Sequence, residues 1–369
     1  MKFTTTAKRL KQALQIVEAA LPTRTTLPAA THVKISASGK TITLTTTNLH
    51  LMIQYTFEAD IKKEGVAVVP AKRLLDFSKT LSSEELSAKL EGKFLEITAG
   101  KALLEMPVLP DQEFPEVAHV TGQAFTVKQT DLREALRLTS FAAEQNTDRY
   151  ILNGCYLSFT PTDQCSILAT DSRRLAQYTF SVVSMPKKPD AVKFLFPQGA
   201  AKLLQSHLEH EVDTVVTQGE RHVSVSFTAP AGDSYYMSFN QVEGQYPDCK
   251  ALIPAATNAN KVDRQNLLMA LKRAIAAVDA DGRVHLKFRA GSIDIEASGT
   301  GASASGRVLE PVTAEYSGKP IDATFTPKYL VEVLDELKDE TIEFDITGTE
   351  RPMIFTSKGY IYLNMPLRA

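Results

Sequence analysis

The clearest pattern along the chain is a set of apolar positions spaced three and four residues apart, which occurs once in each third of the 369-residue sequence. Each set follows a short stretch in which apolar and polar residues alternate, and Lys and Arg residues lie off the apolar face. Such spacing is typical of an amphipathic helix, and alternation is typical of a strand. We therefore predict a strand followed by a cation-bearing helix at the start of each third. The apolar positions are Leu10, Ala13, Leu14, Val17 and Leu21, then Leu132, Ala135 and Leu136, then Leu267, Leu268, Leu271 and Ile275.

A second helix is predicted in each third, because a proline ends a β-rich run there, at Pro70, Pro197 and Pro327. Proline at the first position of a helix loses nothing, since that N–H has no partner within the helix. The predicted helices span 71–81, 199–208 and 328–337. Alternating segments such as 223–227 and 342–346 are predicted to be strands.

A repeat connects the first two thirds. The sequence Gln-Tyr-Thr-Phe at 54–57 recurs at 177–180, and Thr47-Asn48 recurs as Thr170-Asp171 at the same offset of 123 residues. Two markers with one period, in a chain of 369 residues, indicate three copies of one unit. The predicted fold is α+β, with three repeated domains of two helices and a β-sheet at 1–120, 121–254 and 255–369.

The composition is that of an ordinary globular protein, with 43% hydrophobic residues and a formal net charge of -2. Any affinity for nucleic acid would therefore come from local basic stripes. No signal-peptide pattern and no apolar run of membrane-spanning length is found, so we expect a cytoplasmic protein without membrane contact. The three cysteines lack Cys-x-x-Cys spacing, and we expect no metal and no cofactor.

No catalytic constellation stands out. The Gly- and Ser-rich segment 299–306 has neither a Lys after its glycines nor Gly-x-Ser-x-Gly spacing, so a hairpin connection is the better interpretation. His207 and His210 have helical spacing but no third ligand nearby, and a solvated helix end explains them. We expect a protein that is not an enzyme, although a hydrolase with an unrecognised site remains an alternative.

Five motifs, at 109–115, 148–154, 169–176, 246–248 and 365–368, converge on one family. The chain resembles the bacterial sliding clamps, the β subunits of DNA polymerase III, over its whole length. The resemblance implies a closed ring of two subunits joined head to tail, the DNA clamp fold, in which helices line a hole that holds duplex DNA. It also implies a non-catalytic processivity factor of the DNA-directed DNA polymerase holoenzyme.

The same resemblance implies the partners: duplex DNA bound without sequence preference, the DNA polymerase III catalytic subunit, the clamp loader, and other polymerases and repair proteins with short linear motifs. A specialised clamp paralogue that acts as a peptide-binding scaffold is the alternative. Lys and Arg on a helix are usually solvated charge, but their recurrence in every third favours a surface that meets phosphate. The DNA contacts that the resemblance implies are Arg24, Lys72, Asn146, Arg149 and Tyr150.

The resemblance further implies an apolar peptide-binding pocket between the second and third domains. Without the family, a core position or a frayed chain end would explain these residues equally well. Ser172-Arg173 stands where the family usually has Gly-His, and Lys250-Ala251 replaces a more basic pair, so the rim of the pocket differs. The implied pocket residues are Thr170, Arg173, Arg174, Leu175, Pro247, Leu252, Met353, Met365, Pro366, Leu367 and Arg368.

The ring requires a contact between two chains. We expect it between the strand at 102–108, where Leu104 and Met106 supply apolar bulk, and the edge of the third domain near Leu268 and Lys272. An ordinary core strand at 102–108 is the alternative.

Overall fold

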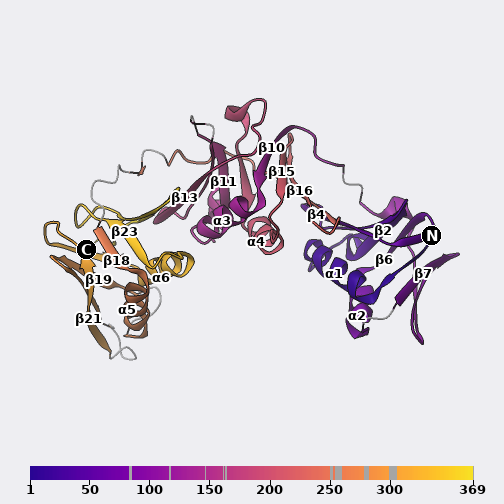
Figure 1. Cartoon of the computed structure of the whole chain (residues 1–369), viewed down its shortest axis with the longest axis horizontal. Helices are drawn as coiled ribbons and strands as arrows, with labels where there is room; N and C mark the ends of the chain where they lie inside the picture. The colour runs from indigo at the N-terminus through magenta and orange to yellow at the C-terminus, as the bar shows by residue number, and fades with distance from the viewer. Residues whose placement is uncertain are drawn as a thin grey trace. The chain divides into compact units, whose positions relative to one another are not determined.

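The computed structural model describes residues 1–82, 85–115, 118–145, 147–160, 162, 164–249, 252–253, 260–277, 282–298 and 306–368. The chain folds as two compact units, and Figure 1 labels helices and strands of both. The first contains Met1–Leu132, Val182–Val192 and Ser206–Gln241, and the second contains Arg133–Ser181, Lys193–Gln205 and Val242–Ala369. The middle third of the sequence is thus shared between the two units, and the three domain boundaries expected from the sequence stay a prediction.

The first unit contains two antiparallel sheets, and its larger sheet crosses the boundary between the first two thirds of the sequence. The order of that sheet is β10-β15-β16-β17-β4-β3-β2-β6, and β17 pairs with β4. The smaller sheet has the order β5-β1-β7-β8-β9. The strands from the first third are β1 (Lys2–Thr6), β2 (His32–Ser38), β3 (Thr41–Thr47), β4 (Leu51–Glu58), β5 (Asp60–Lys63), β6 (Gly65–Pro70), β7 (Glu85–Glu91), β8 (Phe94–Ala99) and β9 (Ala102–Pro107). Those from the middle third are β10 (Gln123–Lys128), β15 (Asp213–Gln218), β16 (His222–Thr228) and β17 (Ser234–Asn240).

The second unit is built on one long sheet that crosses the next boundary in the same way. Its order is β14-β11-β12-β13-β25-β24-β23-β18-β21-β20-β19-β22, and β13 pairs with β25. The strands from the middle third are β11 (Gly154–Phe159), β12 (Gln164–Thr170), β13 (Arg174–Ser181) and β14 (Phe194–Pro197). Those from the last third are β18 (Asn260–Asp263), β19 (Val284–Arg289), β20 (Ser292–Ser298), β21 (Arg307–Glu315), β22 (Ile321–Phe325), β23 (Thr341–Asp345), β24 (Met353–Ser357) and β25 (Tyr360–Asn364).

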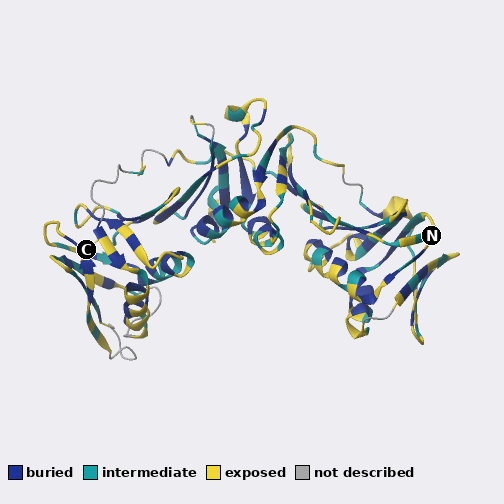
Figure 2. Cartoon of the chain, in the orientation of Figure 1, coloured by how far each residue is buried: buried dark blue, intermediate teal, exposed yellow. Residues whose placement is uncertain are grey.

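In the part of the chain that the structure describes, each third supplies two α-helices, as the sequence predicts. They are α1 (Ala7–Val17), α2 (Ala71–Thr80), α3 (Gln129–Ser140), α4 (Gln198–His207), α5 (Arg264–Ala277) and α6 (Pro327–Glu336). Figure 2 shows that each helix carries both buried and exposed residues. In α1 the buried residues include Leu10, Ala13, Leu14 and Val17, which confirms the predicted apolar face. Leu21 lies outside the helix, because a 3-10 turn (Glu18–Ala20) follows Val17.

The helix starts follow from local chemistry. The side-chain oxygen of Thr6 accepts a hydrogen bond of 3.2 Å from the Arg9 N–H, which caps α1. Pro70 directly precedes α2, and Pro327 is the first residue of α6. These positions confirm the expectation that proline marks the second helix of each third.

The repeat is preserved as a turn of the same geometry in two places. In the first copy, between β3 and β4, the Thr47 hydroxyl donates to the Leu51 carbonyl (3.0 Å). The Asn48 side-chain oxygen accepts from the N–H groups of His50 (3.0 Å) and Leu51 (2.8 Å). Leu49 adopts a positive φ of 75°.

In the second copy, between β12 and β13, the Thr170 hydroxyl donates to the Arg174 carbonyl (2.6 Å). The Asp171 side-chain oxygen accepts from the N–H groups of Arg173 (2.9 Å) and Arg174 (3.0 Å), and Ser172 adopts a φ of 74°. The recurring Thr-Asn and Thr-Asp pairs therefore mark one hydrogen-bonded turn that the chain uses twice.

The segment 299–306 lies outside the described residues except at its end, so its interpretation as a hairpin connection stays a prediction. In the described part of the chain, no helix combines the length and the apolar character needed to cross a membrane.

Candidate functional site

One pocket of the second unit is built across five neighbouring strands. In the antiparallel register, Thr170 of β12 lies opposite Leu175 of β13, and Leu175 lies opposite Leu363 of β25. Leu363 in turn lies opposite Ile354 of β24, which lies opposite Asp345 of β23. These five residues form one cross-strand row, and all of them line a pocket of about 650 Å³. Because neighbouring strands are about 4.8 Å apart, the row is about 19 Å long.

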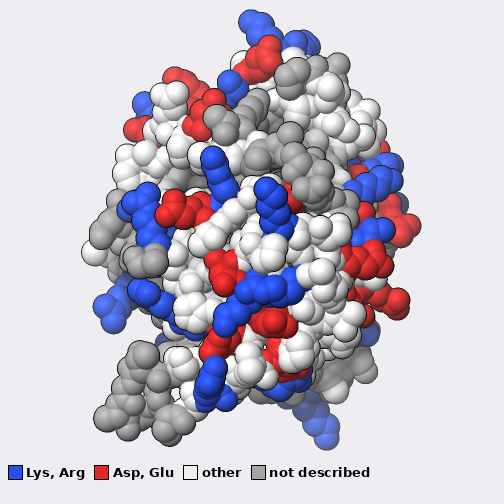
Figure 3. All heavy atoms as spheres, turned by 90° about the vertical axis from the view of Figure 1, so that its left-hand side faces the viewer, with Lys and Arg blue, Asp and Glu red and all other residues white. Residues whose placement is uncertain are grey.

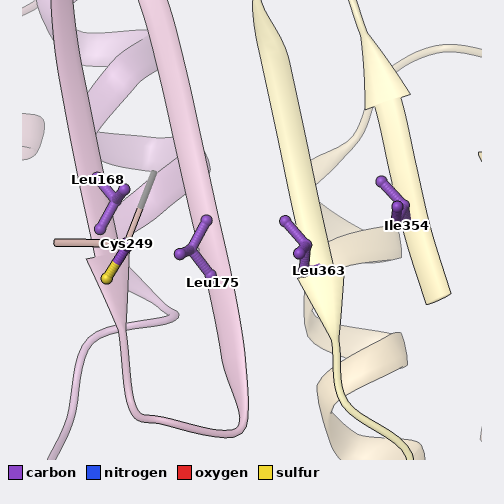
Figure 4. Packing of buried hydrophobic residues seen from close by; sticks show 5 residues of the cluster. All are labelled: Leu168, Leu175, Cys249, Ile354 and Leu363. Atoms are coloured by element: carbon purple, nitrogen blue, oxygen red, sulfur yellow. The ribbon is translucent and has the colours of Figure 1, made fainter. Parts of the chain in front are cut away.

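The floor of the pocket is apolar. Leu168, Leu175, Cys249, Ile354 and Leu363 form one buried cluster (Figure 4). The four aliphatic side chains come from the adjacent strands β12, β13, β25 and β24, and Cys249 reaches the cluster from the segment after β17. Burial raises the pKa of the Cys249 thiol, and the neighbouring Asp248 raises it further. Cys249 therefore packs as an uncharged group.

The structure brings together part of the predicted pocket. The predicted residues that line it are Thr170, Arg173, Arg174, Leu175, Leu252 and Met365. Ser172, which the resemblance places at the rim, also lines the pocket, and the lining residues that the sequence did not predict are Asp345, Ile346, Thr347, Arg351, Pro352, Ile354 and Leu363. The runs around Ile354 and Leu363 are apolar on both faces of β24 and β25, so no alternation indicates these two residues, and no sequence signal points to Arg351.

Met353 is a correction. It lies opposite Asn364 of β25, one position away from Ile354, and its side chain is fully buried. Since successive side chains of a strand point to opposite faces, Met353 belongs to the side of the sheet away from the pocket. The prediction that Met353 lines the pocket is therefore wrong.

The chain end also departs from the prediction. The Met365 N–H donates to the Arg173 carbonyl (2.8 Å), which ties the end of β25 to the turn after β12. The chain then turns toward β22, where the Leu367 N–H donates to the Thr324 carbonyl (2.7 Å). The structure accordingly places Pro247, Pro366, Leu367 and Arg368 outside the pocket lining.

Arg174 anchors the pocket to the helices behind it. Its buried guanidinium donates to Asp171 (2.9 Å), to the carbonyl of Phe141 (2.7 Å) and to Glu332 of α6. It also lies 4.3 Å from the centre of the Tyr329 ring. Burial alone would lower the pKa of Arg174, but Tyr362, Glu332 and Asp171 outweigh it and raise the pKa above its usual value. Arg174 is thus a permanently charged structural link.

The turn beside the pocket contains strained backbone. Ser172 has a φ of 74°, where a side chain costs about 1 kcal/mol and glycine costs nothing. Glycine, which the resemblance implies at this position, would adopt this conformation without that cost. The serine hydroxyl accepts a hydrogen bond of 2.7 Å from the Arg149 guanidinium, a contact that glycine cannot make.

The repeat-related position in the first unit lacks an apolar floor. There the cross-strand row consists of Thr47, Met52, Ser238, Ser224 and Thr217. Two serines thus stand where the pocket has Leu363 and Ile354. A larger open hollow of about 1120 Å³ lies on this sheet, but it is lined mainly by polar side chains such as Ser36, Thr43 and Gln54. The apolar pocket of the second unit is therefore the better binding site for an apolar segment.

The predicted DNA contacts are accessible where the structure describes them. Arg24 lies in an exposed segment before β2, and Lys72 is exposed in the first turn of α2. Arg149 and Tyr150 are exposed in the 3-10 segment Thr147–Leu152 of the second unit. Asn146 lies outside the described residues.

Two helix cations that were expected to face solvent, Arg9 and Arg137, form ion pairs with other residues of the chain. Arg9 pairs with Asp233 and lies 5.7 Å from the centre of the Phe57 ring. Arg137 pairs with Glu134 (2.5 Å) and Glu336 (2.7 Å). The basic helix faces are therefore smaller than the sequence pattern indicates.

The strand predicted to meet a second chain is an edge strand. β9 ends the smaller sheet of the first unit and pairs only with β8 in that sheet. Leu103 is the exposed apolar residue, at 61%, while Leu104 is half-buried. Met106 is 1% exposed and packs in the chain's own core, which corrects the expectation that it supplies apolar bulk to an interface.

The helix predicted to meet that strand needs a similar correction. Leu268 of α5 is 3% exposed and belongs to the core of its own unit, so it has almost no surface to offer a second chain. Lys272 on the same helix is exposed and forms an ion pair of 2.7 Å with Asp335.

Comparison with known proteins gives consistent matches over the whole chain. The profiles of the N-terminal, central and C-terminal domains of the DNA polymerase III beta subunit match residues 1–118, 126–248 and 250–367. The chain is 28% identical to the beta sliding clamp of Pseudomonas aeruginosa, with 100% of both chains covered. It is 29% identical to that of Synechococcus elongatus, with 100% of this chain and 99% of the other covered.

Solved structures agree with these matches. The sliding clamp of Pseudomonas aeruginosa bound to griselimycin is 26% identical, with a TM-score of 0.91 and 100% of both chains covered. The clamp of Bartonella birtlesii bound to griselimycin is 25% identical, with a TM-score of 0.90 and the same coverage. The fold of three α+β repeats and the full-length matches together show that this chain belongs to the family of DNA polymerase III beta subunits, the bacterial sliding clamps.

Proposed function

We propose that this protein, a non-catalytic sliding clamp, encircles duplex DNA and tethers the replicative polymerase and other partners through the apolar pocket of its second unit. The observation that carries this proposal is the row from Thr170 to Asp345, with its apolar centre of Leu175, Leu363 and Ile354. A pocket of this kind at the surface of a clamp fold suits a partner that must be held and exchanged.

The dimensions of the row indicate what binds. An extended segment advances about 3.3 Å per residue, so about six residues span the row. The apolar floor favours Leu and Phe side chains, and the thioether of Met365, 45% exposed, can repack around different residues. Such a segment buries less than a standard protein interface, so the affinity should be about micromolar. The griselimycin complexes of the Pseudomonas and Bartonella clamps support a site for a peptide-like ligand.

The partners that fit this pocket are those implied by the family. They are the DNA polymerase III catalytic subunit, the clamp loader, and other polymerases and repair proteins that carry a short linear motif. Since each would use the same row, they would compete for one pocket per chain.

DNA would be held mainly by enclosure. Arg24, Lys72, Arg149 and Tyr150 are exposed and would contact the sugar-phosphate backbone, which carries no sequence information directly. Asn146 completes the proposed set. Such a small number of contacts gives weak, salt-sensitive direct binding.

The ring would be a homodimer closed head to tail by two sheet edges. One is β9, with Leu103 and Leu104. The other is the part of β21 before Thr313, which among the described residues pairs with β20 alone and carries Leu309, 62% exposed. Unpaired strand edges of this kind are normally covered in proteins. Lys272 remains a candidate contact beside this edge. On the face drawn in Figure 3, Lys and Arg are interspersed with Asp and Glu. A surface that meets this face therefore needs charges of both signs.

The pocket and the ring can be tested together. Met365→Ala should weaken binding of a Leu- and Phe-bearing peptide about tenfold or more, measured by fluorescence anisotropy, because a contact at the pocket mouth is lost. Met269→Ala, an exposed methionine of α5 outside the pocket lining, is the matched control.

The same two proteins should both stay on nicked circular DNA after loading and slide off when the circle is cut. Equal peptide affinity for both variants would contradict the proposal that the peptide binds in the pocket. Release from the intact circle would contradict the proposal that the protein closes into a ring around the DNA.

A further inference from the structure

The polar hollow of the first unit contains a row of side chains that crosses six adjacent strands. Each member lies directly opposite the next in the antiparallel register, and all of them line the hollow of about 1120 Å³. Because neighbouring strands are about 4.8 Å apart, the row is about 24 Å long. The members of this six-strand row, from β2 to β15, are Lys34, Thr45, Gln54, Tyr236, Ser226 and Val215.

The next row along the same strands satisfies its own hydroxyl groups. The hydroxyls of Thr43 and Thr56 are hydrogen-bonded to each other at 2.9 Å. Those of Thr228 and Ser234 are hydrogen-bonded at 3.2 Å. These side chains also line the hollow, but their main hydrogen-bonding needs are met within the chain.

The six-strand row differs, because three of its polar side chains have no partner. Within the part of the chain that the structure describes, the side chains of Thr45, Gln54 and Ser226 form no hydrogen bond. Thr45 is only 6% exposed, although it lines the hollow. A buried polar group without a partner costs free energy, and a ligand that hydrogen-bonds to it removes that cost.

The charged groups of the hollow are matched within the chain. Lys34 pairs with Asp111 (2.6 Å), and Asp213 pairs with Lys128 (2.8 Å). Among the described residues, Lys34, Asp111 and Asp213 are the only Lys, Arg, Asp or Glu side chains that line the hollow. An incoming segment therefore meets hydroxyl and amide groups without an unmatched side-chain charge of these types.

We propose that the six-strand row docks an extended, uncharged segment of a partner protein that is rich in Ser, Thr, Asn and Gln. Hydroxyl and amide side chains both donate and accept hydrogen bonds, so Thr45, Gln54 and Ser226 can bind the N–H and C=O groups of an extended main chain. Such a segment advances about 3.3 Å per residue, so about seven residues span the row. An apolar segment would leave these groups unpaired, and a charged segment would find no matching charge.

This docking site goes beyond the proposed function, because it lies in the first unit and does not use the apolar pocket. The repeat supports its location. Met52, which lines the hollow beside the row, is the counterpart of Leu175 at the offset of 123 residues. The two sheets thus carry sites at related positions with different chemistry, apolar in the second unit and polar in the first.

Binding at the hollow should be weak. A neutral hydrogen bond that replaces a bond to water contributes little net free energy, so we expect a dissociation constant of about 1 mM. A readout that is sensitive to weak binding is therefore needed.

The test uses NMR of the full-length protein with carbon-13 labels in its methionine methyl groups. Met52 reports on the hollow, and Met365 reports on the apolar pocket. Three seven-residue peptides, all acetylated and amidated, are titrated. The first contains Ser, Thr, Asn and Gln only, the second carries Leu and Phe anchors, and in the third Asp and Lys replace two polar residues of the first.

Three variants accompany the natural protein. Thr45→Val combined with Gln54→Leu removes two of the unpartnered polar groups, and Thr45→Val alone removes one hydroxyl with little change of shape. Gln123→Leu is the matched control, because Gln123 belongs to β10 of the same sheet and does not line the hollow.

The polar peptide should shift the Met52 signal of the natural protein and leave the Met365 signal in place. Its affinity should fall about fivefold or more in the double variant and about twofold in Thr45→Val, and it should be unchanged in Gln123→Leu. The signals of the other methionines should keep their positions, which shows that the variants are folded.

Three results would overturn the proposal: no shift of Met52 with the polar peptide, an undiminished affinity in Thr45→Val and the double variant, or tighter binding of the charged peptide at Met52. The Leu- and Phe-bearing peptide should shift Met365 in all four proteins. If it failed to do so, the proposed function of the pocket would fail, while the response of Met52 would still decide the docking site in the hollow.

Discussion

Arg174 offers the most direct test of how the pocket is held in place. We consider the substitution Arg174→Met, which keeps an unbranched apolar side chain in place of the aliphatic part of arginine and removes its charge and its donors. The natural guanidinium serves Asp171, Glu332 and the Phe141 carbonyl, and it lies over the Tyr329 ring. Methionine can fill the space of the aliphatic part of arginine but cannot donate to any of the three acceptors.

The magnitude follows from what is left behind. Asp171 keeps the hydrogen bonds that its Oδ1 accepts from the backbone N–H groups of Arg173 and Arg174, while its Oδ2 loses the Arg174 guanidinium. Glu332 and the Phe141 carbonyl lose their partner. Removing one member of a buried ion pair costs about 3–5 kcal/mol. The Glu332 side chain is 29% exposed, and water can replace part of the lost interaction. We therefore expect the free energy of unfolding to fall by about 3 kcal/mol, the low end of that range.

The measurement is urea unfolding of the full-length protein, followed by circular dichroism, for a double-mutant cycle of Arg174→Met and Glu332→Gln. If the two side chains interact as the structure shows, Glu332→Gln should cost less in the Arg174→Met background than alone. Arg174→Lys retains the charge without the planar fork, so its loss of stability should be intermediate. A loss below about 1 kcal/mol for Arg174→Met, or a coupling energy of zero, would refute this account of the pocket.

Two further predictions concern the ring. Arg24→Ala combined with Lys72→Ala should weaken direct binding to unrelated duplexes equally. It should also reduce the slope of the logarithm of the binding constant against the logarithm of salt concentration by the share of about two phosphate contacts, measured by anisotropy at several salt concentrations. A preference for one sequence would contradict this prediction. Leu103→Lys should raise the dissociation constant of the dimer about tenfold or more in sedimentation equilibrium, because it places a charge at the β9 edge, whereas Phe94→Lys, on the neighbouring strand, should not. An unchanged dimer with Leu103→Lys would show that the chains meet elsewhere.

The helices and the repeated turn could be predicted from the sequence because their causes are local. The apolar spacing from Leu10 to Val17 is enough to specify one helix face, and the Thr6 cap and the prolines mark where helices begin. The pairs Thr47-Asn48 and Thr170-Asp171 each close a turn with bonds that span only a few residues. Local hydrogen bonds of this kind form in the same way wherever the sequence recurs.

Which side chains line the pocket depends on the register of the strands. Register is set by pairing between segments that lie far apart in the sequence. Met353 and Ile354 are adjacent apolar residues, and only the pairing of Ile354 with Leu363 and Asp345 decides that Ile354 lines the pocket. A shift of one residue would exchange the two faces. Because both faces of these strands are partly covered, the run is apolar throughout and shows no alternation that could decide between them.

The burial of the expected interface residues also depends on the tertiary structure. Met106 and Leu103 are equally plausible on an apolar edge strand, and only the sheet to which β9 belongs turns Met106 inward and leaves Leu103 exposed. Arg351 reaches the pocket through a turn that lies far along the chain from Arg173. The sequence by itself therefore determined the elements, their repetition and the family, since these depend on neighbours along the chain. The tertiary structure decided which side chains meet in the pocket and at the edges, since that depends on strand pairing between distant segments.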